Sequence, residues 1–341
     1  MFSIVIINWN GRKNLGGLLD KCLESVANTS YKNFEVLFVD NASTDGSYEY
    51  EKSRFDFKFL RNKENLGFVG GNNVGAKFCR GDVMVFLNND TIVDAAWLNE
   101  PAKLFEKPEI GMVQSNLRML ENPAVPDSIG HIISAIVMPI ENFFFTGEPI
   151  EPEPIFGGKG AALFIRRELF EKLGGFDEDY FYYFEESDLC WRARLLGYEV
   201  YFSPASRVLH KGGGTFKDGQ ILYHKVLHDK LLYHRQKNTI SSMIKCYELK
   251  NLMKYLPLRL LFELNAILYL LFKKPSLALN NMKSLVWVLR NTEKLVKKRK
   301  QIQRTRIIRD EELFRRGFIT RSMKLTFMYT KSRLGMFEAA K

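Results

Sequence analysis

Apolar runs of strand length alternate with helical periodicity through the first hundred residues. Three runs rich in β-branched and aromatic residues predict strands at Phe2–Asn8, 34–39 and 82–87. Between and after them, apolar residues recur every three or four positions and predict helices at 13–27, 43–53, 70–78 and 94–105. Strands that are apolar throughout and separated by helices predict an α/β fold, with a mostly parallel sheet covered on both faces.

The pattern changes twice further along the chain. Proline and aromatic residues interrupt it between 117 and 154, which predicts a long excursion over the ligand-binding face of the sheet. Ordered periodicity then returns, with strands expected at 160–165 and 199–202 and helices expected from 167 and over 186–196. From 237 onward the pattern is wholly helical. We therefore expect an α/β domain over 1–236 and a helical region over 237–341.

Charge divides the chain at the same place. The formal net charge is +11, but residues 1–236 hold 26 Lys and Arg against 32 Asp and Glu, whereas residues 237–341 hold 24 against 7. The first region is therefore acidic, with a net charge of −6, and the second is basic, with +17. Because the whole basic excess lies in the last third of the chain, the overall charge is no signature of nucleic-acid binding, and we expect no nucleic-acid partner.

Cysteine usage and composition further limit the class of protein. Four cysteines lie far apart without a CxxC pair, which excludes a disulfide scaffold and a cysteine-rich zinc site and fits a reducing cytosol. A 46% hydrophobic content is ordinary for a globular protein. The N-terminus has no basic stretch or cleavage site, so no secretory signal is expected.

Polar residues follow each predicted strand, where parallel sheets bind ligands. The first strand ends in Asn8 and Asn10, and the second ends at Asp40. A carboxylate in this position can accept the imide N–H of a uracil or thymine, and Ser43 is a candidate N-cap for the following helix. An ordinary capped turn explains the same residues equally well.

The third strand ends in Asn88, Asn89 and Asp90. A hard divalent cation prefers oxygen ligands and keeps positions open for phosphate oxygens, so Asp90 is a candidate ligand for Mg²⁺ or Mn²⁺. One carboxylate is few for a metal site unless another ligand comes from elsewhere in the chain. The alternative is a helix N-cap.

Three carboxylates in four residues form the most distinctive cluster: Glu185, Glu186 and Asp188. Mutual repulsion and the aromatic run before them would raise a carboxyl pKa and favour a general base. An acidic helix N-terminus, stabilised by the helix dipole, is the alternative.

Histidines offer two further candidates. His210 ends a short apolar run and precedes glycines that would let backbone approach a phosphate closely. His224 and His228 have the i, i+4 spacing of a zinc pair, but no third ligand or adjacent Glu accompanies them, so we do not expect a zinc site there.

The helical region combines apolar and cationic features. Residues 255–272 are strongly apolar, but Arg259, Glu263 and Asn265 interrupt them, which makes a poor bilayer span. Lysines at both ends suit a helix that lies in the membrane interface. The alternative is a helical hairpin packed on the first domain, with solvated lysines.

Seven motifs in order resemble one family: SIVIINWNG (3–11), VDNASTDGS (39–47), NLGFVGGNN (65–73), FLNNDT (86–91), GGFD (174–177), YFEESDLC (183–190) and VLH (208–210). Together they resemble the family 2 glycosyltransferases, especially the rhamnosyltransferase-like and galactofuranosyltransferase-like branch, over about residues 2–216. The resemblance implies a GT-A fold and an inverting transferase that uses a dTDP- or UDP-sugar donor, a divalent cation and a saccharide acceptor.

The resemblance also implies roles for individual residues. Asp40 would read the pyrimidine base, and the remaining donor-binding residues would be Asn8, Asn10, Asn65, Gly67, Asn72, Asn88 and Asn89. Asn88 replaces the first Asp of the family's DxD motif, so Asp90 and His210 would hold the metal. Glu186 would be the general base, with Glu185 and Asp188 as the neighbouring candidates.

Two rival functions remain at this point. A sugar-phosphate nucleotidyltransferase would share the pyrimidine-binding half but would leave the acidic cluster without a role. A non-catalytic, membrane-associated nucleotide-sugar-binding protein would leave Asp90, Glu186 and His210 as coincidence. The basic tail and its apolar segment lead us to expect an enzyme in the cytoplasm, bound peripherally to the inner face of the cell membrane, with a lipid-linked saccharide as acceptor.

Overall fold

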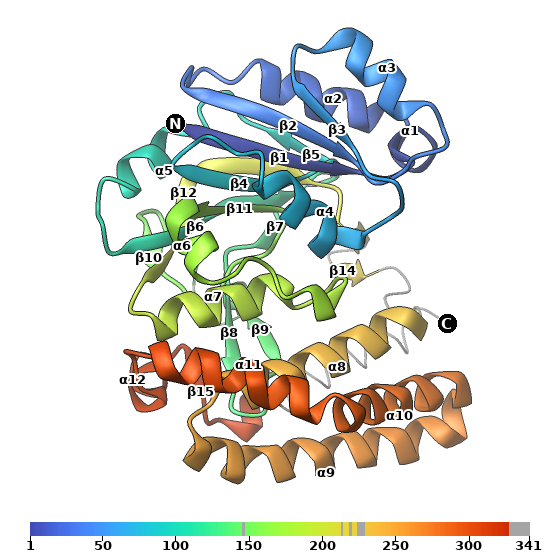
Figure 1. The fold of residues 1–341 in the computed structure, drawn as a ribbon, viewed down its shortest axis with the longest axis vertical. Coiled ribbons are helices and arrows are strands. Elements are labelled where there is room, and N and C mark those ends of the chain that lie inside the picture. Colours follow the sequence, from blue (N-terminus) through green and yellow to red (C-terminus); the bar gives the residue numbers. More distant parts are fainter. Residues whose placement is uncertain (145–146, 213, 218–219, 224–228, 327–341) are drawn as a thin grey trace. The chain divides into compact units, whose positions relative to one another are not determined.

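The computed structural model of the chain describes residues 1–144, 147–212, 214–217, 220–223 and 229–326 (Figure 1). His224 and His228 lie outside these residues. The chain divides into two compact units. Unit 1 comprises 1–130, 142–193 and 198–212, and unit 2 comprises 131–141, 194–197 and 213–341. The boundary that the sequence predicts between 236 and 237 falls inside the helix α8 (Asp229–Cys246).

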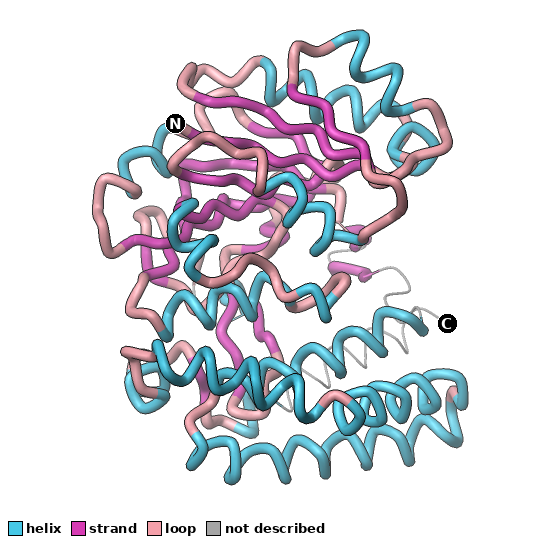
Figure 2. The backbone as a smooth tube through the Cα atoms, viewed as in Figure 1, coloured by secondary structure: helices cyan, strands magenta, loops and turns pink. Residues whose placement is uncertain are grey.

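Unit 1 is built on a ten-stranded sheet (Figure 2). Eight strands follow the order β10 (Glu153–Pro154), β12 (Glu199–His210), β6 (Ile110–Met119), β11 (Ala162–Arg166), β4 (Val83–Asn88), β1 (Phe2–Asn8), β2 (Phe34–Asp40) and β3 (Lys58–Arg61). Two short strands pair beside this path, β5 (Thr91–Val93) with β12 and β7 (Pro126–Ser128) with β6. Only β11 and β10 oppose the common direction of the ordered path. The predicted mostly parallel sheet is confirmed.

Helices cover both faces of this sheet, as the continuous apolar runs require. The helices of unit 1 are α1 (Gly11–Leu15), α2 (Gly17–Ala27), α3 (Ser47–Arg54), α4 (Gly67–Ala76), α5 (Asn99–Leu104), α6 (Arg167–Lys172) and α7 (Glu185–Leu195), with 3₁₀ turns η1 (Asn142–Phe144) and η2 (Glu178–Tyr180). Ile4 and Ile6 of β1 pack in one core cluster with Leu19 and Leu23 of α2. Val5, which points to the other face, lies against Gly75 of α4.

Two predicted elements differ from the structure. The strand expected at 199–202 is longer: β12 continues to His210, with a register irregularity between Ser203 and Arg207. A bulge of this kind lets one strand pair with β6 along two stretches. The helix expected from Ser43 begins instead at Ser47, with Gly46 in the left-handed conformation as its N-cap, so the prediction that Ser43 is the cap is wrong.

Unit 2 contains the helical region and a small sheet. Its strands are β8 (His131–Ser134), β9 (Pro139–Glu141) and β15 (Ile319–Thr320), with a hairpin of β13 (Gly214–Lys217) and β14 (Gln220–Tyr223). Its other helices are α9 (Leu249–Lys273), α10 (Pro275–Arg290), α11 (Thr292–Thr305) and α12 (Asp310–Arg315). Ile240, Val288 and Leu295 join α8, α10 and α11 in one core. The proline-rich excursion thus supplies strands to both units.

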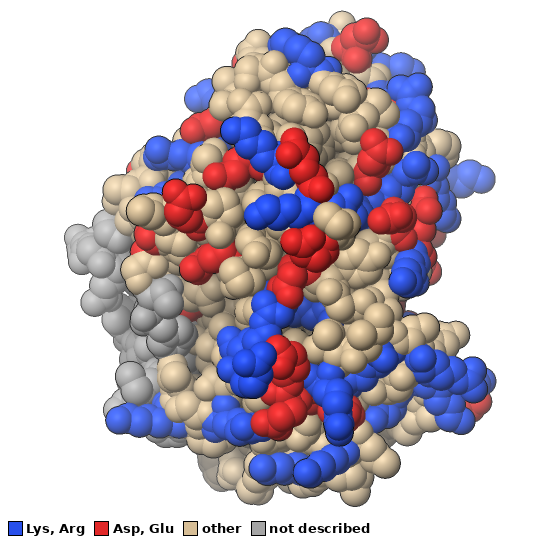
Figure 3. Space-filling view, turned by 90° about the vertical axis from the view of Figure 1, so that its left-hand side faces the viewer, with Lys and Arg blue, Asp and Glu red and all other residues tan. Residues whose placement is uncertain are grey.

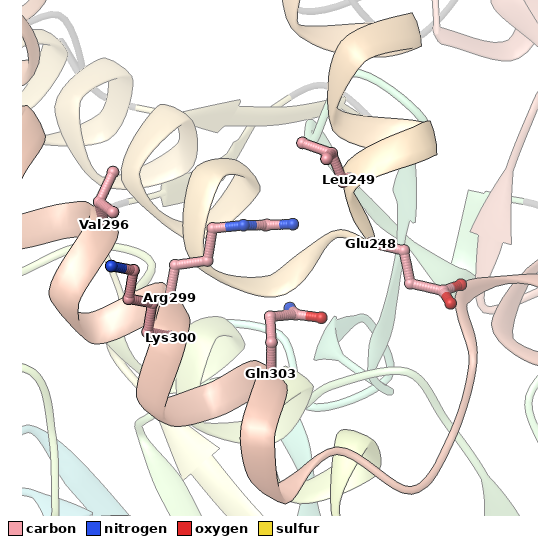
Figure 4. Close-up of a pocket in the computed structure, with 6 residues that line it drawn as sticks. All are labelled: Glu248, Leu249, Val296, Arg299, Lys300 and Gln303. Atoms are coloured by element: carbon pink, nitrogen blue, oxygen red, sulfur yellow. The ribbon is translucent and has the colours of Figure 1, made fainter.

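Some basic and polar residues of α11 hold unit 2 together. A pocket of about 410 Å³ is lined by Glu248, Leu249, Val296, Arg299, Lys300 and Gln303 (Figure 4). Arg299 and Gln303 donate hydrogen bonds of 2.5–3.0 Å to four successive carbonyls at the end of α8: those of Ile244, Lys245, Cys246 and Tyr247. A helix end leaves such carbonyls without intrahelical partners. Part of the basic tail therefore serves packing.

Surface charge is mixed on the face drawn in Figure 3, where acidic and basic side chains are interspersed. All four cysteines are buried thiols, with no disulfide between them.

Candidate functional site

Asn8 connects the ends of three strands in unit 1. Its side-chain nitrogen donates to Asp40 Oδ1 at 3.0 Å and to Ser47 Oγ at 2.8 Å, and its oxygen accepts from Asn89 at 3.0 Å. A Cβ on Gly11 would lie 2.2 Å from that oxygen, so only glycine fits there. The strand-end residues that the sequence singles out therefore form one hydrogen-bonded cluster.

Asp40 lies at the centre of this cluster, and its side chain is fully buried. Its carboxylate accepts from the backbone N–H of Ser43 at 2.9 Å and from the Ser43 hydroxyl, and Arg61 lies 3.6 Å away. Asn10, in the left-handed conformation, donates its backbone N–H to Ser43 Oγ at 2.8 Å. These contacts close a turn, as one of the two alternatives from the sequence expects; base recognition by Asp40 stays a prediction.

The predicted donor-binding residues after β3 lie at the start of α4. Asn65 accepts from the backbone N–H of Gly67 at 2.9 Å, and the Gly67 carbonyl accepts from Asn41 at 3.0 Å. Gly67 has a φ of 68°, and a Cβ there would lie 2.7 Å from the ring of Phe181. Asn72 is buried, and its Oδ1 has no hydrogen-bond partner among the described residues.

The aromatic run before α7 is strained. Phe181, Tyr183 and Phe184 have φ values of 55°, 75° and 73°, in the left-handed region that large side chains rarely adopt. Such strain persists only where surrounding contacts enforce it, and it collects at functional sites. Here it sets the start of α7, where the acidic cluster begins.

Glu185 is buried and Glu186 is half-buried, while Asp188 has a different environment. Glu185 Oε2 and Glu186 Oε2 are enclosed and have no hydrogen-bond partner in the described part of the chain. Burial and the neighbouring Glu186 raise the pKa of Glu185 well above its usual value. Burial also raises the pKa of Glu186, against the lowering effect of backbone N–H groups, including that of Gly160, and of the Lys159 charge.

Asp188, the third carboxylate, has hydrogen-bond partners of its own. It accepts from Arg192 Nε at 2.7 Å and from the Tyr180 hydroxyl at 3.1 Å, and it is fully buried. Arg192 also donates to the carbonyls of Leu173 and Gly175. Asp188 therefore fastens α7 to the preceding turn, and its role as a base stays a prediction.

Asp90 and His210 lie together, as the metal prediction requires. His210 ends β12 and pairs with Thr91 of β5, which places its Nε2 3.3 Å from Asp90 Oδ1 and 3.4 Å from the Asn88 amide. Burial would lower the pKa of His210, but the carboxylates of Asp90 and Asp127 raise it to about 9. The site thus stabilises positive charge between these side chains.

Two residues that the sequence did not single out complete the cluster. Asp127, on β7, lies 2.8 Å from His210 Nδ1 and 2.6 Å from Lys159 Nζ. Burial would raise the pKa of Asp90, but the His210 charge, with a smaller contribution from Lys159, holds it below its usual value. Lys159 and Gly160 therefore join the two clusters: the Gly160 N–H bonds Glu186, and Lys159 pairs with the partner of His210.

The residues present fit a divalent cation with few protein ligands. Asp90 Oδ1 is buried without a hydrogen-bond donor among the described residues, and an imidazole nitrogen lies beside it. No group of three or more His, Cys, Asp or Glu side chains arranged for a metal occurs in the described ranges. Asp90 and His210 would be the protein ligands, which would leave coordination positions for phosphate oxygens and water.

Comparison with known proteins identifies the family. Residues 3–174 match the model of glycosyl transferase family 2. A Haemophilus influenzae protein named as an uncharacterized glycosyltransferase is 27% identical over 51% of this chain, and the N-acetylglucosaminyl-diphospho-decaprenol L-rhamnosyltransferase of Mycobacterium tuberculosis is 29% identical over 64% of this chain and 79% of its own length. The solved structure of GalNAc-T7 with UDP, GalNAc and Mn²⁺ superposes with a TM-score of 0.56 at 18% identity, over 72% of this chain and 48% of that one.

The structural match confirms the GT-A fold that the motifs imply. The sequence matches cover only parts of several relatives: 56% of the Haemophilus protein, and 23% and 17% of two further relatives.

Proposed function

The chain belongs to glycosyl transferase family 2, and on this premise we propose that it transfers a sugar from a nucleotide-diphospho-sugar to a hydroxyl group of a saccharide, with inversion at the anomeric carbon. The observation that carries the proposal is that Lys159 and Gly160 connect the two clusters. The backbone N–H of Gly160 bonds Glu186, and Lys159 pairs with Asp127, the partner of His210.

Asp90 and His210 are the proposed ligands of Mg²⁺ or Mn²⁺. Such a cation would neutralise charge on the leaving nucleoside diphosphate. The strand-end cluster of Asn8, Asn10 and Asp40 would hold the nucleoside, with dTDP or UDP as the donor nucleotide. The GalNAc-T7 structure, which contains UDP and Mn²⁺, supports this choice of donor and cofactor.

Glu186 is the proposed general base. It would take the proton of the acceptor hydroxyl as the oxygen forms a bond to the anomeric carbon and the bond to the diphosphate breaks. A single displacement of this kind inverts the anomeric configuration and needs no covalent intermediate. Glu185, whose pKa is raised further, would stay protonated beside it.

Donor hydrolysis separates this proposal from its rivals. Purified protein should hydrolyse a nucleotide sugar slowly, with water as acceptor, and a panel of dTDP-rhamnose, UDP-galactofuranose, UDP-glucose and UDP-N-acetylglucosamine would identify the donor. A nucleotidyltransferase would instead release pyrophosphate from a nucleoside triphosphate in the presence of a sugar phosphate. A binding protein would bind a donor without turning it over.

A lipid-linked saccharide at the cytoplasmic face of the membrane is the proposed acceptor. The +17 charge of residues 237–341 supports a location at an anionic surface. The Mycobacterium tuberculosis relative, whose name includes a diphospho-decaprenol acceptor, supports the acceptor class.

Metal dependence is tested by Asp90→Ala. The variant should bind the nucleotide sugar more weakly in Mg²⁺ or Mn²⁺ and should no longer respond to a chelator, because it loses the only carboxylate of the proposed ligand pair. Titration calorimetry with and without chelator measures both effects. Wild-type hydrolysis that is indifferent to chelator would remove the metal role of Asp90 and His210.

Asp127→Asn tests whether Asp127 orients His210. The amide keeps the size of the carboxylate but loses its charge, so it holds the Nδ1 proton less firmly. Losing the partner of a metal-binding histidine weakens metal affinity by about 10- to 100-fold. Mn²⁺ binding, followed by electron paramagnetic resonance, should show this loss in protein that circular dichroism shows to be folded at the assay temperature. Unchanged Mn²⁺ affinity would leave Asp127 as a partner of Lys159 alone.

A further inference from the structure

One side of α9 exposes an apolar stripe, which we call the outer face and define by Met253, Leu261, Leu264, Leu268 and Phe272. These side chains are 68%, 58%, 53%, 57% and 89% exposed. Their spacing of three, four or eight residues places them on one side of the helix. Soluble proteins rarely leave so continuous an apolar stripe in water, so the outer face calls for a partner.

The opposite side of α9 carries the charges that interrupt the apolar sequence. Arg259 and Glu263 are buried and lie 2.9 Å apart. Arg259 donates to the carbonyls of Ile136 and Val137 at 2.7 and 3.2 Å within unit 2. Because both charges point inward, they do not break the outer face. From the sequence alone, we expected both charges to interrupt the apolar segment 255–272.

The neighbouring helix α10 also exposes apolar side chains, and the exposed charges of α9 and α10 are cations. On α10, which packs against α9, Leu279, Met282, Val286 and Leu289 are also exposed. Throughout 249–290, every residue of which the structure describes, the exposed charged residues are all basic: Lys250, Lys254, Lys273, Lys274, Lys283 and Arg290. Glu263, the one carboxylate in this range, is buried.

The apolar outer face and the basic residues around it favour one kind of partner over another. A second copy docked on the same face would bring lysines against lysines, which opposes association. An anionic bilayer offers an apolar layer for the stripe and negative headgroups for its borders. We propose that the outer face of α9 embeds lengthwise in the headgroup and acyl boundary of an anionic leaflet. The inference deepens the proposed membrane location and is independent of the transfer chemistry.

Crossing the bilayer is the competing arrangement. By length and composition α9 qualifies as a spanning helix, the one such helix among the residues described, and 22% of its most apolar eighteen-residue window is buried. Length and composition therefore permit a span, contrary to the expectation that residues 255–272 make a poor one. Spanning, however, would strip Arg259 of its partners outside α9 and place the Arg259–Glu263 pair in hydrocarbon, which is costly. Lengthwise insertion keeps these contacts.

The test is flotation of the full chain with phosphatidylcholine vesicles that contain phosphatidylglycerol. The variant Leu264→Asp/Leu268→Asp changes the outer face. The matched control, Ile150→Asp/Ile307→Asp, adds the same charge at two exposed isoleucines outside α9 and α10. The outer-face variant should lower vesicle affinity by about ten-fold or more, because it removes apolar contact and adds repulsion. The control should stay within about two-fold of the wild type, since the net charge changes little.

Several outcomes would overturn the proposal. Equal losses in both variants would mean that net charge alone governs binding. Full binding of the outer-face variant would exclude the outer face, and wild-type protein that dimerises without floating would assign it to a second copy. If depth-dependent quenchers place α9 residues at every depth of the bilayer, the helix spans it instead. Donor hydrolysis without lipid should be equal in all three proteins, so its absence would refute the transferase proposal and leave the flotation result intact.

Discussion

Glu186→Gln should reduce donor hydrolysis by roughly 10²-fold or more, as expected on removing a general base, while donor affinity stays unchanged. Glutamine has nearly the same shape as glutamate but cannot take a proton. One oxygen of the Glu186 carboxylate is enclosed without a hydrogen-bond partner among the described residues, so it is not committed to another contact. Initial rates and donor titrations of the same preparations separate turnover from binding.

Glu185→Gln is the matched control for this prediction. The pKa of Glu185 is raised well above its usual value by burial and by Glu186, which favours the neutral form of Glu185 beside a charged Glu186. Glutamine resembles that neutral form, and its effect on turnover should be much smaller. A larger loss in Glu185→Gln than in Glu186→Gln would transfer the role of base to Glu185.

The pH dependence of donor hydrolysis should also identify Glu186 as the base. A base must be ionised to act, and burial raises the pKa of Glu186. Hydrolysis should therefore increase as the pH rises through this raised pKa and level off above it. That rising limb should be missing from Glu186→Gln.

Much of the sheet was predictable from the sequence because its strands are apolar throughout and end in polar residues. Asn8, Asp40 and Asn89 come from different strands and meet at the same edge, as parallel strands require. Asp90 and His210 also meet, although 120 residues separate them, because β12 pairs with β5. The sequence motif marked each residue, and the strand pairing accounts for their proximity.

Other features depend on tertiary contacts that local patterns do not encode. Asp127 lies in the proline-rich stretch, where no periodicity marks a strand, and it reaches His210 only because β7 pairs with β6. Ser43 resembles an N-cap by type, but its hydroxyl bonds Asp40 instead. The inward direction of Arg259 and Glu263 was also hidden, since residues on every side of α9 are apolar and the helical period cannot tell which side is buried.

Arg259→Met should have the largest effect on stability. Removing one partner of a buried ion pair leaves an uncompensated charge and costs about 3–5 kcal/mol. Here the loss would also leave the carbonyls of Ile136 and Val137 without the guanidinium donor. Urea unfolding, followed by circular dichroism, should show a large fall in the midpoint, which would mark α9 as an integral part of unit 2.

Two matched variants make the stability prediction specific to burial. Lys297→Met breaks the exposed Lys297–Glu293 pair, which has the same i, i+4 spacing, and should leave the midpoint nearly unchanged because water already solvates both charges. Arg259→Met/Glu263→Leu removes the buried pair altogether and should recover much of the lost stability, since apolar replacement of such pairs is often neutral or favourable. An Arg259→Met midpoint no lower than that of Lys297→Met would mean that α9 is not anchored through this pair, and the argument against a spanning helix would lose its main support.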